Sequence, residues 1–179
     1  MPRTRTDVER DAKVDQILDA AEARLDAGGY EALSVAAIAR ELGVAQNAIY
    51  WYFPSKDHLF VAAMQRMLRG IVARKPRGDT GPVARILWFT DRFAALSSLR
   101  SSMNDRARRS PVVAEFVEQL ESHLSRMLAG VLRGRVPDGD LDVAVETFRA
   151  TAEGTFAKGL GDAERRRVLT FALERLMED

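Results

Sequence analysis

The spacing of apolar residues constrains the fold of this chain more than any other feature of its sequence. Apolar side chains recur three and four residues apart nearly everywhere, and the every-second-residue alternation typical of half-buried strands does not persist. Gly, Pro and clusters of charged residues divide this pattern into about nine segments. The sequence therefore predicts an all-α fold without internal repeats.

The composition is that of an ordinary globular protein. The chain has 179 residues, of which 46% are hydrophobic and 30% are charged, so it can bury a substantial core. No apolar run reaches the roughly 18 residues that a transmembrane helix needs, and no apolar segment typical of a secretory signal follows the N-terminus. Cysteine is absent and histidine occurs twice. We therefore expect a cytoplasmic protein with no membrane association, no metal site and no cofactor.

The first helical segments have clear end signals. The first segment carries an apolar stripe over residues 14–25 and is predicted to end at Gly28-Gly29, because glycine tolerates a left-handed cap. The second is predicted from about Ser34 to Leu42, with Ser34 as N-cap and Gly43 as the stop.

The remaining segments are bounded by proline, glycine and charge. A third short helix ends before Pro54, and Ser55 can cap a long fourth helix that fades near Pro76. Residues 77–82, rich in Gly, Pro and charge, form the clearest boundary in the chain. Five more helical segments are expected after it, with breaks near 100–104, Pro111, 137–139 and 159–161.

Residues 34–53 meet the physical requirements of a helix-turn-helix motif. Its two helices must cross closely, which the small Ala39 allows, and the turn needs the positive φ that Gly43 adopts at little cost. The inward side chains would be Ile38, Leu42, Val44 and Ile49. The alternative is a plain helical hairpin inside a bundle.

The second helix of this motif has side chains suited to reading DNA. It begins with Gln46 and Asn47, whose amides can each pair with adenine in the major groove. Tyr50 follows one turn later, and Trp51 and Tyr52 give this short helix more aromatic rings than a small core can hold. Tyr50 could be a buried ring with a satisfied hydroxyl, but the aromatic density favours a ring against DNA.

These residues resemble a known family. Residues 43–60, GVAQNAIYWYFPSKDHLF, are similar to the operator-reading segment of the tetracycline-repressor (TetR) family of bacterial regulators. Residues 17–21, 28–30 and 33–39 look like the first two helices of that family. The similarity covers about residues 12 to 60, and spacing and residue type agree across four helices.

The resemblance implies an N-terminal three-helix DNA-binding domain in residues 1–54, a connecting helix in 55–76 and a C-terminal helical domain for ligand binding and dimerisation in 77–179. It implies that bases are contacted by Gln46, Asn47 and Tyr50 and the DNA backbone by Ser34, Trp51, Tyr52 and Lys56. Ala45 departs from the family, which often has Ser or Thr there. The missing hydroxyl removes about 0.5–2 kcal/mol of helix capping.

The distribution of charge contains features that argue for DNA binding and features that argue against it. The whole chain has a net charge of +1, and residues 1–60 hold seven basic and ten acidic groups, a net of −3. The acidic groups concentrate between Asp7 and Asp26, and the helix that would read DNA has none. Arg3 and Arg5 on an N-terminal arm could reach a minor groove, and Lys56 lies at a helix start near the expected phosphate. We expect affinity to depend on dimerisation.

The C-terminal part indicates architecture more clearly than ligand. Two helices, around residues 83–96 and 113–131, would form the walls of a pocket. The candidate ligand-binding residues are Trp88, Phe89, Phe93, Met103, Phe116, His123 and Met127. The alternative is that these side chains are core, with His123 at its boundary. Glu115 and Glu118 fall on the opposite face and should be solvated.

The last two helices are candidates for a homodimer interface. Residues 141–159 carry a face of mostly small residues, which lets helices approach closely. The candidate interface residues are Ala144, Phe148, Thr151, Ala152, Thr155, Leu169 and Leu173. The alternative is that both helices pack only within the monomer. Residues 165–167, three arginines, are expected to be a solvated helix start.

Three functions compete at this point. The first is a ligand-responsive transcriptional repressor that binds a palindromic double-stranded DNA operator as a homodimer and is released by a small apolar or amphipathic molecule. The second is a helical interaction module that has lost DNA binding. The third is an enzyme, which is disfavoured because no nucleophile–base set, phosphate-binding loop, metal cluster or dinucleotide fingerprint occurs.

Overall fold

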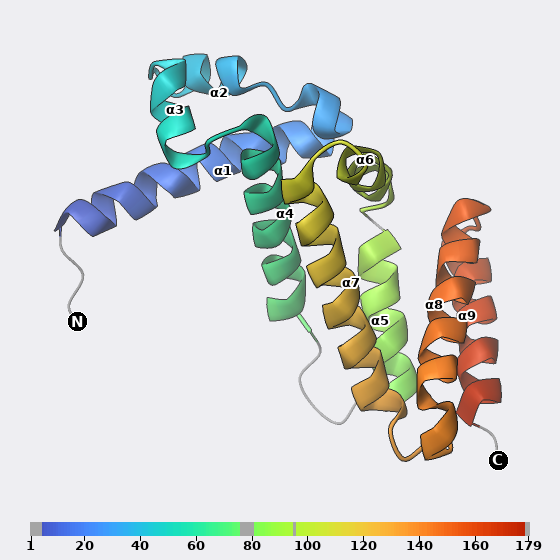
Figure 1. The fold of residues 1–179 in the computed structure, drawn as a ribbon. Helices are drawn as coiled ribbons and strands as arrows, with labels where there is room; N and C mark the ends of the chain where they lie inside the picture. The colour runs from blue at the N-terminus through green and yellow to red at the C-terminus, as the bar shows by residue number, and fades with distance from the viewer. Residues whose placement is uncertain (1–4, 76–80, 95, 178–179) are drawn as a thin grey trace. The chain divides into compact units, whose positions relative to one another are not determined.

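The computed structural model describes residues 5–75, 81–94 and 96–177 (Figure 1). These residues form nine α-helices and one short 3-10 helix, and no strand occurs within them. The all-α prediction is therefore confirmed. Residues 77–80 of the predicted boundary lie outside the described residues. Arg3 does too, and the predicted minor-groove arm is therefore described only from Arg5 onward.

The chain divides into two compact units. The first contains residues 1–73 and 98–117, and the second contains residues 74–97 and 118–179. The chain thus leaves the first unit after the fourth helix and returns to it for the sixth and the start of the seventh. The functional division into 1–54, 55–76 and 77–179 stays a prediction, because packing follows this return of the chain and not three consecutive segments.

Helix α1 (Arg5–Ala32) is broken near its end by the predicted pair of glycines. Gly28 has an extended φ of −165°, and Gly29 has a φ of 65°, in the region that favours glycine. The helical path resumes after this kink and ends at Ala32. The glycines thus interrupt the helix where its end was predicted, but they form a kink, and the helical path continues to Ala32.

Helices α2 (Val35–Glu41) and α3 (Gln46–Tyr52) form the predicted helix-turn-helix. The Ser34 side chain accepts a hydrogen bond from the Ala37 amide at 3.2 Å, which caps α2. Gly43 in the turn has a φ of 64°, as the motif requires. Ile38 and Ile49 are fully buried between the two helices and the rest of the unit.

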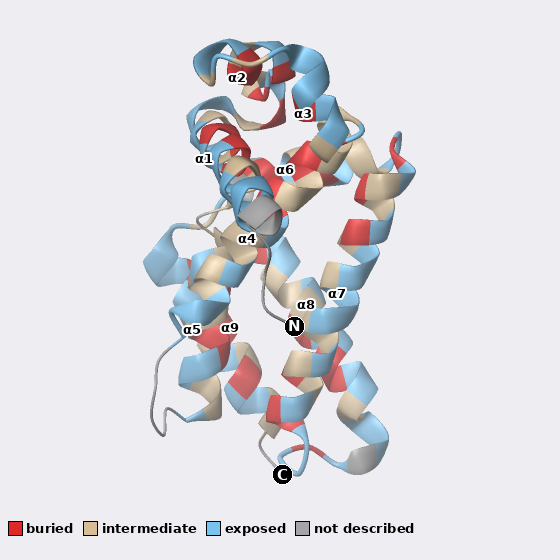
Figure 2. Ribbon diagram, turned by 90° about the vertical axis from the view of Figure 1, so that its left-hand side faces the viewer, coloured by how far each residue is buried: buried red, intermediate tan, exposed pale blue. Residues whose placement is uncertain are grey.

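Helices α4 (Lys56–Ala73) and α6 (Ser97–Ala107) and the start of α7 (Pro111–Leu132) complete the first unit. Ser55 caps α4 by accepting a hydrogen bond from the His58 amide. The predicted break at residues 100–104 is wrong, because α6 runs through it with Leu99 and Met103 buried four residues apart. The buried positions are red in Figure 2, and the largest fully buried side chains of the first unit are Ile17, Leu25, Leu33, Ile38, Ile49, Leu59, Phe60, Met64 and Val113.

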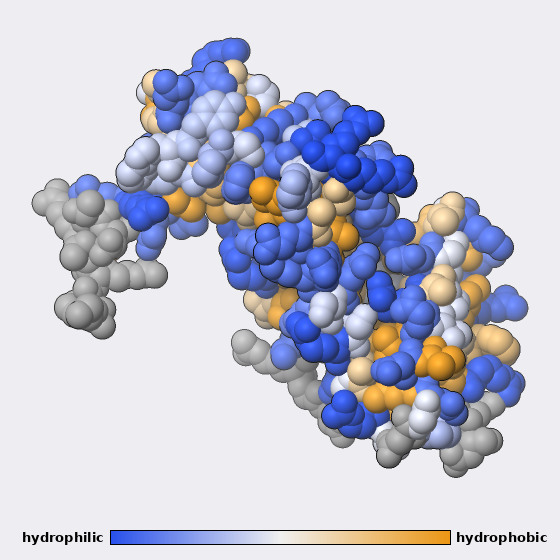
Figure 3. All heavy atoms as spheres, viewed as in Figure 1, coloured by the Kyte–Doolittle hydropathy of each residue, from blue (hydrophilic) through white to orange (hydrophobic). Residues whose placement is uncertain are grey.

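The second unit joins α5 (Pro82–Ala94), the rest of α7, the 3-10 helix Asp138–Asp140, α8 (Leu141–Ala157) and α9 (Asp162–Met177). Its core draws side chains from all four α-helices, and Figure 3 shows hydrophobic groups gathering where α5, α7 and α8 meet. The buried members are Ile86, Leu87, Leu128, Val131, Leu132, Val136, Ala144, Val145, Phe148, Leu169 and Leu173. None of the helices described is long and apolar enough to cross a membrane.

The arginine cluster at the start of α9 is only partly solvated. Arg166 and Arg167 are exposed, as expected, and Arg166 pairs with Asp91 of α5. Arg165 is buried, which corrects the prediction for this residue. Its guanidinium donates to Asp162 at 2.5 Å and lies 5.5 Å from the centre of the Phe156 ring. The arginine is thus part of the packing between α8 and α9.

Candidate nucleic-acid interface

Helix α3 has one buried side and one exposed side. Ile49 is its buried residue, and the N-terminal residues Gln46 and Asn47 are exposed. Tyr50 is 37% exposed and Trp51 is 72% exposed. Packing of the core does not account for two large exposed aromatic side chains on a seven-residue helix, and such exposure is typical of a binding surface. The outward orientation predicted from the aromatic density is therefore observed.

Two polar side chains of this exposed face interact with each other. Gln46 and Tyr50 lie four residues apart, and the Gln46 Nε2 donates to the Tyr50 hydroxyl at 3.3 Å. The contact orients the amide along the exposed face while leaving its carbonyl oxygen available as an acceptor. The arrangement suits a bidentate partner that both donates and accepts, such as adenine.

The expected backbone-contacting residues lie around α3. Ser34 is exposed at the start of α2, and its hydroxyl already accepts the Ala37 amide. Tyr52 is half-buried, and its ring meets Trp51 edge-on at 5.2 Å. Lys56 is half-buried at the start of α4, with its Nζ 4.1 Å from the centre of the Tyr30 ring.

The N-terminus of α3 lacks a side-chain cap. Ala45 is the N-cap residue, with φ −68° and ψ 143°, and no side chain accepts the first amides. These amides, like the amide at the start of any helix, are donors without a partner in the helix. The predicted consequence of having alanine at this position is therefore confirmed.

A half-buried polar network holds the start of α4. The Asp57 carboxylate accepts hydrogen bonds from the Tyr30 hydroxyl at 2.5 Å and from Arg106 at 2.7 and 3.2 Å. Burial would raise the pKa of Asp57, but hydrogen bonds from Arg106, Tyr30 and Ser110 outweigh it and lower this pKa. Burial and the bond to Asp57 raise the pKa of the Tyr30 hydroxyl well above its ordinary value. The network thus joins α1, α4 and α6.

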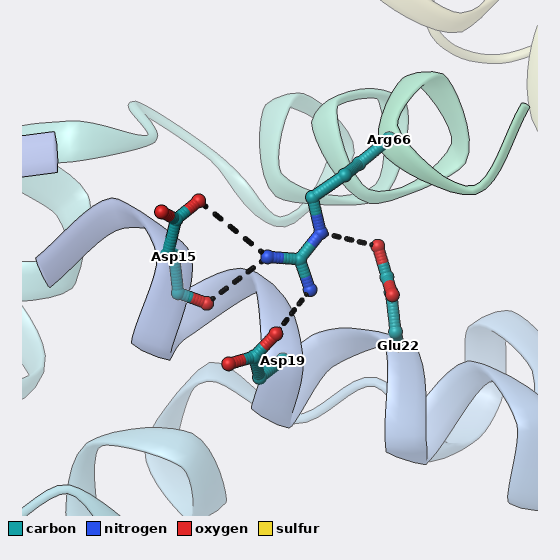
Figure 4. Close-up of polar contacts among 4 residues, drawn as sticks. All are labelled: Asp15, Asp19, Glu22 and Arg66. Atoms are coloured by element: carbon teal, nitrogen blue, oxygen red, sulfur yellow. Dashed lines mark hydrogen bonds and ion pairs between the residues drawn. The ribbon is translucent and has the colours of Figure 1, made fainter. Parts of the chain in front are cut away.

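A second network fixes α4 against α1. Arg66 of α4 reaches between three acidic side chains of α1, as Figure 4 shows. Its Nε donates to Glu22 and its Nη2 to Asp19, each at 2.6 Å, and its Nη1 lies 3.7 Å from Asp15. The three acidic residues share one helix face through their spacing of four and three. The hydrogen bond with Glu22 raises the pKa of Arg66.

These networks account for much of the acidic charge of the N-terminal region. Arg66 and Arg106 lie outside residues 1–60 but pair with four of the ten acidic groups within it. Adding these two cations changes the net charge of −3 to −1. Arg24 also pairs with Glu41 at 2.6 Å. Three of the acidic residues of α1, Asp15, Asp19 and Glu22, are therefore paired with α4, and α3 itself carries no charge.

The predicted ligand-binding residues divide between the two units. Met103 and Phe116 are buried in the first unit, and the other five lie in the second. Among these five, Trp88 and Phe89 meet edge-on at 5.0 Å, and Arg92 lies 5.7 Å from the Trp88 ring. Phe93 and Met127 are half-buried, whereas His123 is exposed. Glu115 and Glu118 are exposed, as predicted.

The predicted dimer residues mostly face inward. Ala144, Phe148 and Leu173 belong to the core of the second unit, and Leu169 is 1% exposed. Thr155 is 3% exposed, and its hydroxyl donates to the Ala152 carbonyl. Thr151 and Ala152 are half-buried. The residues that α8 and α9 turn outward include Val143 and Phe171, which are 65% and 60% exposed.

Sequence reasoning missed the residues that support α3 and α4. Arg10 of α1 lies with its Cζ 5.6 Å from the centre of the Trp51 ring. Asp57 and Arg106, which are 49 residues apart, form the bridge to α6. No local pattern reports such pairs, because they depend on which helix faces meet. Among the described residues, no group of three His, Cys, Asp or Glu side chains could hold a metal ion.

Comparisons with known proteins agree with this architecture. Residues 17–63 match the family model described as bacterial regulatory proteins, tetR family. The chain is 30% identical over 133 residues to the HTH-type transcriptional repressor KstR of Mycobacterium tuberculosis, covering 70% of this chain and 60% of that protein. It is 46% identical over 131 residues to KstR of Rhodococcus jostii, covering 70% and 62%. The chain thus spans about three fifths of the length of these relatives.

A solved structure shares the fold over almost the whole chain. It is a transcriptional regulator from Saccharomonospora viridis in complex with choline, with a TM-score of 0.78 and 18% sequence identity. The match covers 94% of this chain and 100% of that one. The resemblance noted in the sequence is therefore confirmed for the N-terminal helices, which match the tetR family of bacterial regulatory proteins over residues 17–63.

Proposed function

We propose that this protein is a ligand-responsive transcriptional repressor that binds a palindromic operator as a homodimer. The observation that carries the proposal is the exposed face of α3. It presents Gln46, Asn47, Tyr50 and Trp51 on a unit whose helices are tied together by the Arg66 and Asp57 networks. Base-reading side chains need such support, because a shift of about 1 Å breaks bidentate pairing.

The main alternative is a helical interaction module without DNA binding. Its support was the acidic first helix, which would repel phosphates. The pairing of Asp15, Asp19 and Glu22 with Arg66 explains these carboxylates by packing instead. The relatives reported above are transcriptional repressors, which also supports a regulator over an enzyme.

Base reading is tested by variants of α3. Gln46→Ala or Asn47→Ala should weaken binding by about 1–3 kcal/mol per half-site and relax the preference at one or two base pairs. Fluorescence anisotropy with the promoter region of the protein's own gene, and a library of point-changed duplexes, measures both. The matched control is Ala48→Ser, a small exposed change on the same helix. Unchanged base preference in both amide variants would refute base reading by α3.

Backbone contact by Lys56 has a different signature. Lys56→Ala should weaken specific and unrelated duplexes alike and reduce the slope of log affinity against log salt by about one unit per protomer. Because Lys56 also lies against the Tyr30 ring, thermal unfolding of the variant is measured in parallel. A variant that alters base ranking but not the salt slope would contradict this role.

We propose that the dimer forms through the outward faces of α8 and α9. Val143 and Phe171 are exposed apolar side chains on these helices. The buried residues that the sequence predicted for the interface, such as Leu173, pack α8 against α9 within one protomer. Phe171→Glu should give a monomer in sedimentation analysis that no longer binds a palindrome. Val72→Glu, on the exposed side of α4, is the matched control and should remain dimeric. A dimeric Phe171→Glu protein would place the interface elsewhere.

We propose further that a small apolar or amphipathic effector binds among the aromatic side chains of the second unit. Trp88, Phe89 and Phe93 lie on one helix, α5, and all are half-buried, so their rings are not fully used by the core. The solved regulator of the same fold from Saccharomonospora viridis holds choline, a small cation. Phe93→Ala should alter the response to effector while leaving DNA affinity near that of the wild type. Equal loss of both would identify Phe93 as core.

A further inference from the structure

The exposed face of α3, formed by Gln46, Asn47, Tyr50 and Trp51, is here called the recognition face. An arginine of another helix lies against it. Arg10 of α1 is exposed, and its guanidinium carbon lies 5.6 Å from the centre of the Trp51 ring. Trp51 is itself 72% exposed, so the pair forms on the surface and not within the core. A cation within about 6 Å of an indole ring is attracted to its face. The two residues are 41 positions apart in the chain, so the fold brings them together.

Arg10 differs from the other arginines that support this unit. Arg24, Arg66 and Arg106 each pair with carboxylates of the unit. Arg10 lies instead against an uncharged ring, that of Trp51. Since α3 carries no charged residue, Arg10 supplies positive charge beside the aromatic end of the recognition face.

We propose that Arg10, held by Trp51, binds a phosphate of the DNA backbone at the edge of the groove that α3 reads. This inference rests on the proposed function. A guanidinium stacked on a ring keeps its N–H groups directed outward in its plane, where they match two phosphate oxygens. The N-terminal residues of a recognition helix contact bases, and Trp51 is in the last turn, so its neighbour lies toward the backbone.

The pairing also explains why Trp51 is a large ring in an exposed position. A free arginine loses side-chain entropy when it binds a phosphate. The indole face restricts Arg10 before DNA arrives, which reduces that loss. Trp51 is thus a positioning residue for Arg10, and Arg10 makes the contact.

The test measures salt dependence on duplex DNA. The probe is a fluorescent duplex spanning the promoter region of the protein's own gene, with an unrelated duplex of equal length beside it. Each phosphate contact contributes about 0.9 to the slope of log affinity against log salt, or about threefold between about 50 and about 200 mM. Arg10→Ala should lower the slope by about that amount per protomer on both duplexes and leave the base ranking intact.

Lys13→Ala is the matched control, because Lys13 lies on the same helix and contacts Gln16 instead of α3. It should leave the slope near that of the wild type. Trp51→Leu should lower affinity, and Arg10→Ala should then cost clearly less in the Trp51→Leu background than alone. Thermal unfolding of each variant confirms that the protein is folded.

The outcomes separate this inference from the proposed function. If the wild type binds DNA with a steep salt slope and Arg10→Ala matches Lys13→Ala, Arg10 does not contact phosphate. If the two substitutions are additive in the double variant, Trp51 does not position Arg10. If the wild type binds neither duplex at low salt, the proposed function fails and this inference fails with it.

Discussion

The two units of this protein are held together by different chemistry. In the first unit, arginines cross between helices: Arg66 joins α4 to α1, and Arg106 joins α6 to α4 through Asp57. In the second unit, the helices meet through an apolar core, and the arginines that cross between helices form single, partly exposed ion pairs, Arg166 with Asp91 and Arg149 with Glu121. Hydrogen-bonded networks fix direction as well as distance, whereas apolar packing is non-directional.

The difference follows from what each unit is proposed to do. Base recognition needs side chains held in a narrow range of positions, and the networks around Asp57 and Arg66 tie α4 to α6 and to α1. Effector binding and dimerisation tolerate small shifts of packed helices. The predictions below test whether the units differ in this way, beginning with the property that they share.

Both units should depend equally on their apolar cores. Phe60→Ala in the first unit and Leu173→Ala in the second each empty a fully buried site. We expect losses in the free energy of unfolding of about 3–5 and about 2–5 kcal/mol, measured by urea denaturation. An effect below about 1 kcal/mol at either site would mean that the core of that unit is not built as described.

Removing the crossing arginines should affect the two units unequally. Arg66→Ala leaves three acidic residues without their partner, and we expect a loss of about 1–2 kcal/mol, since much of the network is exposed to solvent. Arg166→Ala is the matched variant in the second unit and should cost less than about 1 kcal/mol. Equal losses would remove the contrast between the units.

The Asp57 network should make the stability of the first unit depend on pH. Because the pKa of folded Asp57 is below its ordinary value of 3.8, its stabilisation is complete above that pH and is lost as the pH falls through the lower folded value. Asp57→Asn should lower the melting temperature at pH 7. It should also flatten the acid side of the profile of unfolding free energy against pH, by at most about 1.4 kcal/mol per pH unit.

A change at the start of α3 should have the smallest effect. Ala45 has the extended conformation of an N-cap but offers no acceptor, so Ala45→Ser should stabilise the protein by about 0.5–1 kcal/mol. Thermal unfolding measures the gain, and Ala48→Ser within the helix is the control, expected to be neutral or slightly destabilising. A gain at both positions would point to a cause other than capping.

The sequence predicts those parts of the fold that local chemistry determines. Ser34, Gly43 and Ser55 mark helix ends through capping and positive φ, and the structure places ends at these residues. The break expected at residues 100–104 is absent, because the polar run there covers the exposed side of α6 while Leu99 and Met103 are buried. Polarity alone does not distinguish a loop from the outer face of a helix.

The sequence predicts the exposed residues of the candidate site but not the residues that support them. Gln46, Asn47 and Trp51 follow from residue type and position in the helix-turn-helix, and all three are exposed. The residues that hold them in place cannot be predicted in the same way. The contact of Arg10 with Trp51 and the bridge from Arg106 to Asp57 join segments more than 40 residues apart, so they depend on helix packing that no local pattern encodes.

The shortness of α3 has a consequence for how target preference changes over time. The helix has seven residues, and Ile49 is its buried residue, so the exposed residues that we propose to read DNA contribute little to folding. Gln46 and Asn47 can therefore be exchanged without loss of the fold, and a duplicated gene can acquire a new operator through a few substitutions. Arg10 and Trp51 are different, because each gives the other its role, and they are expected to change together.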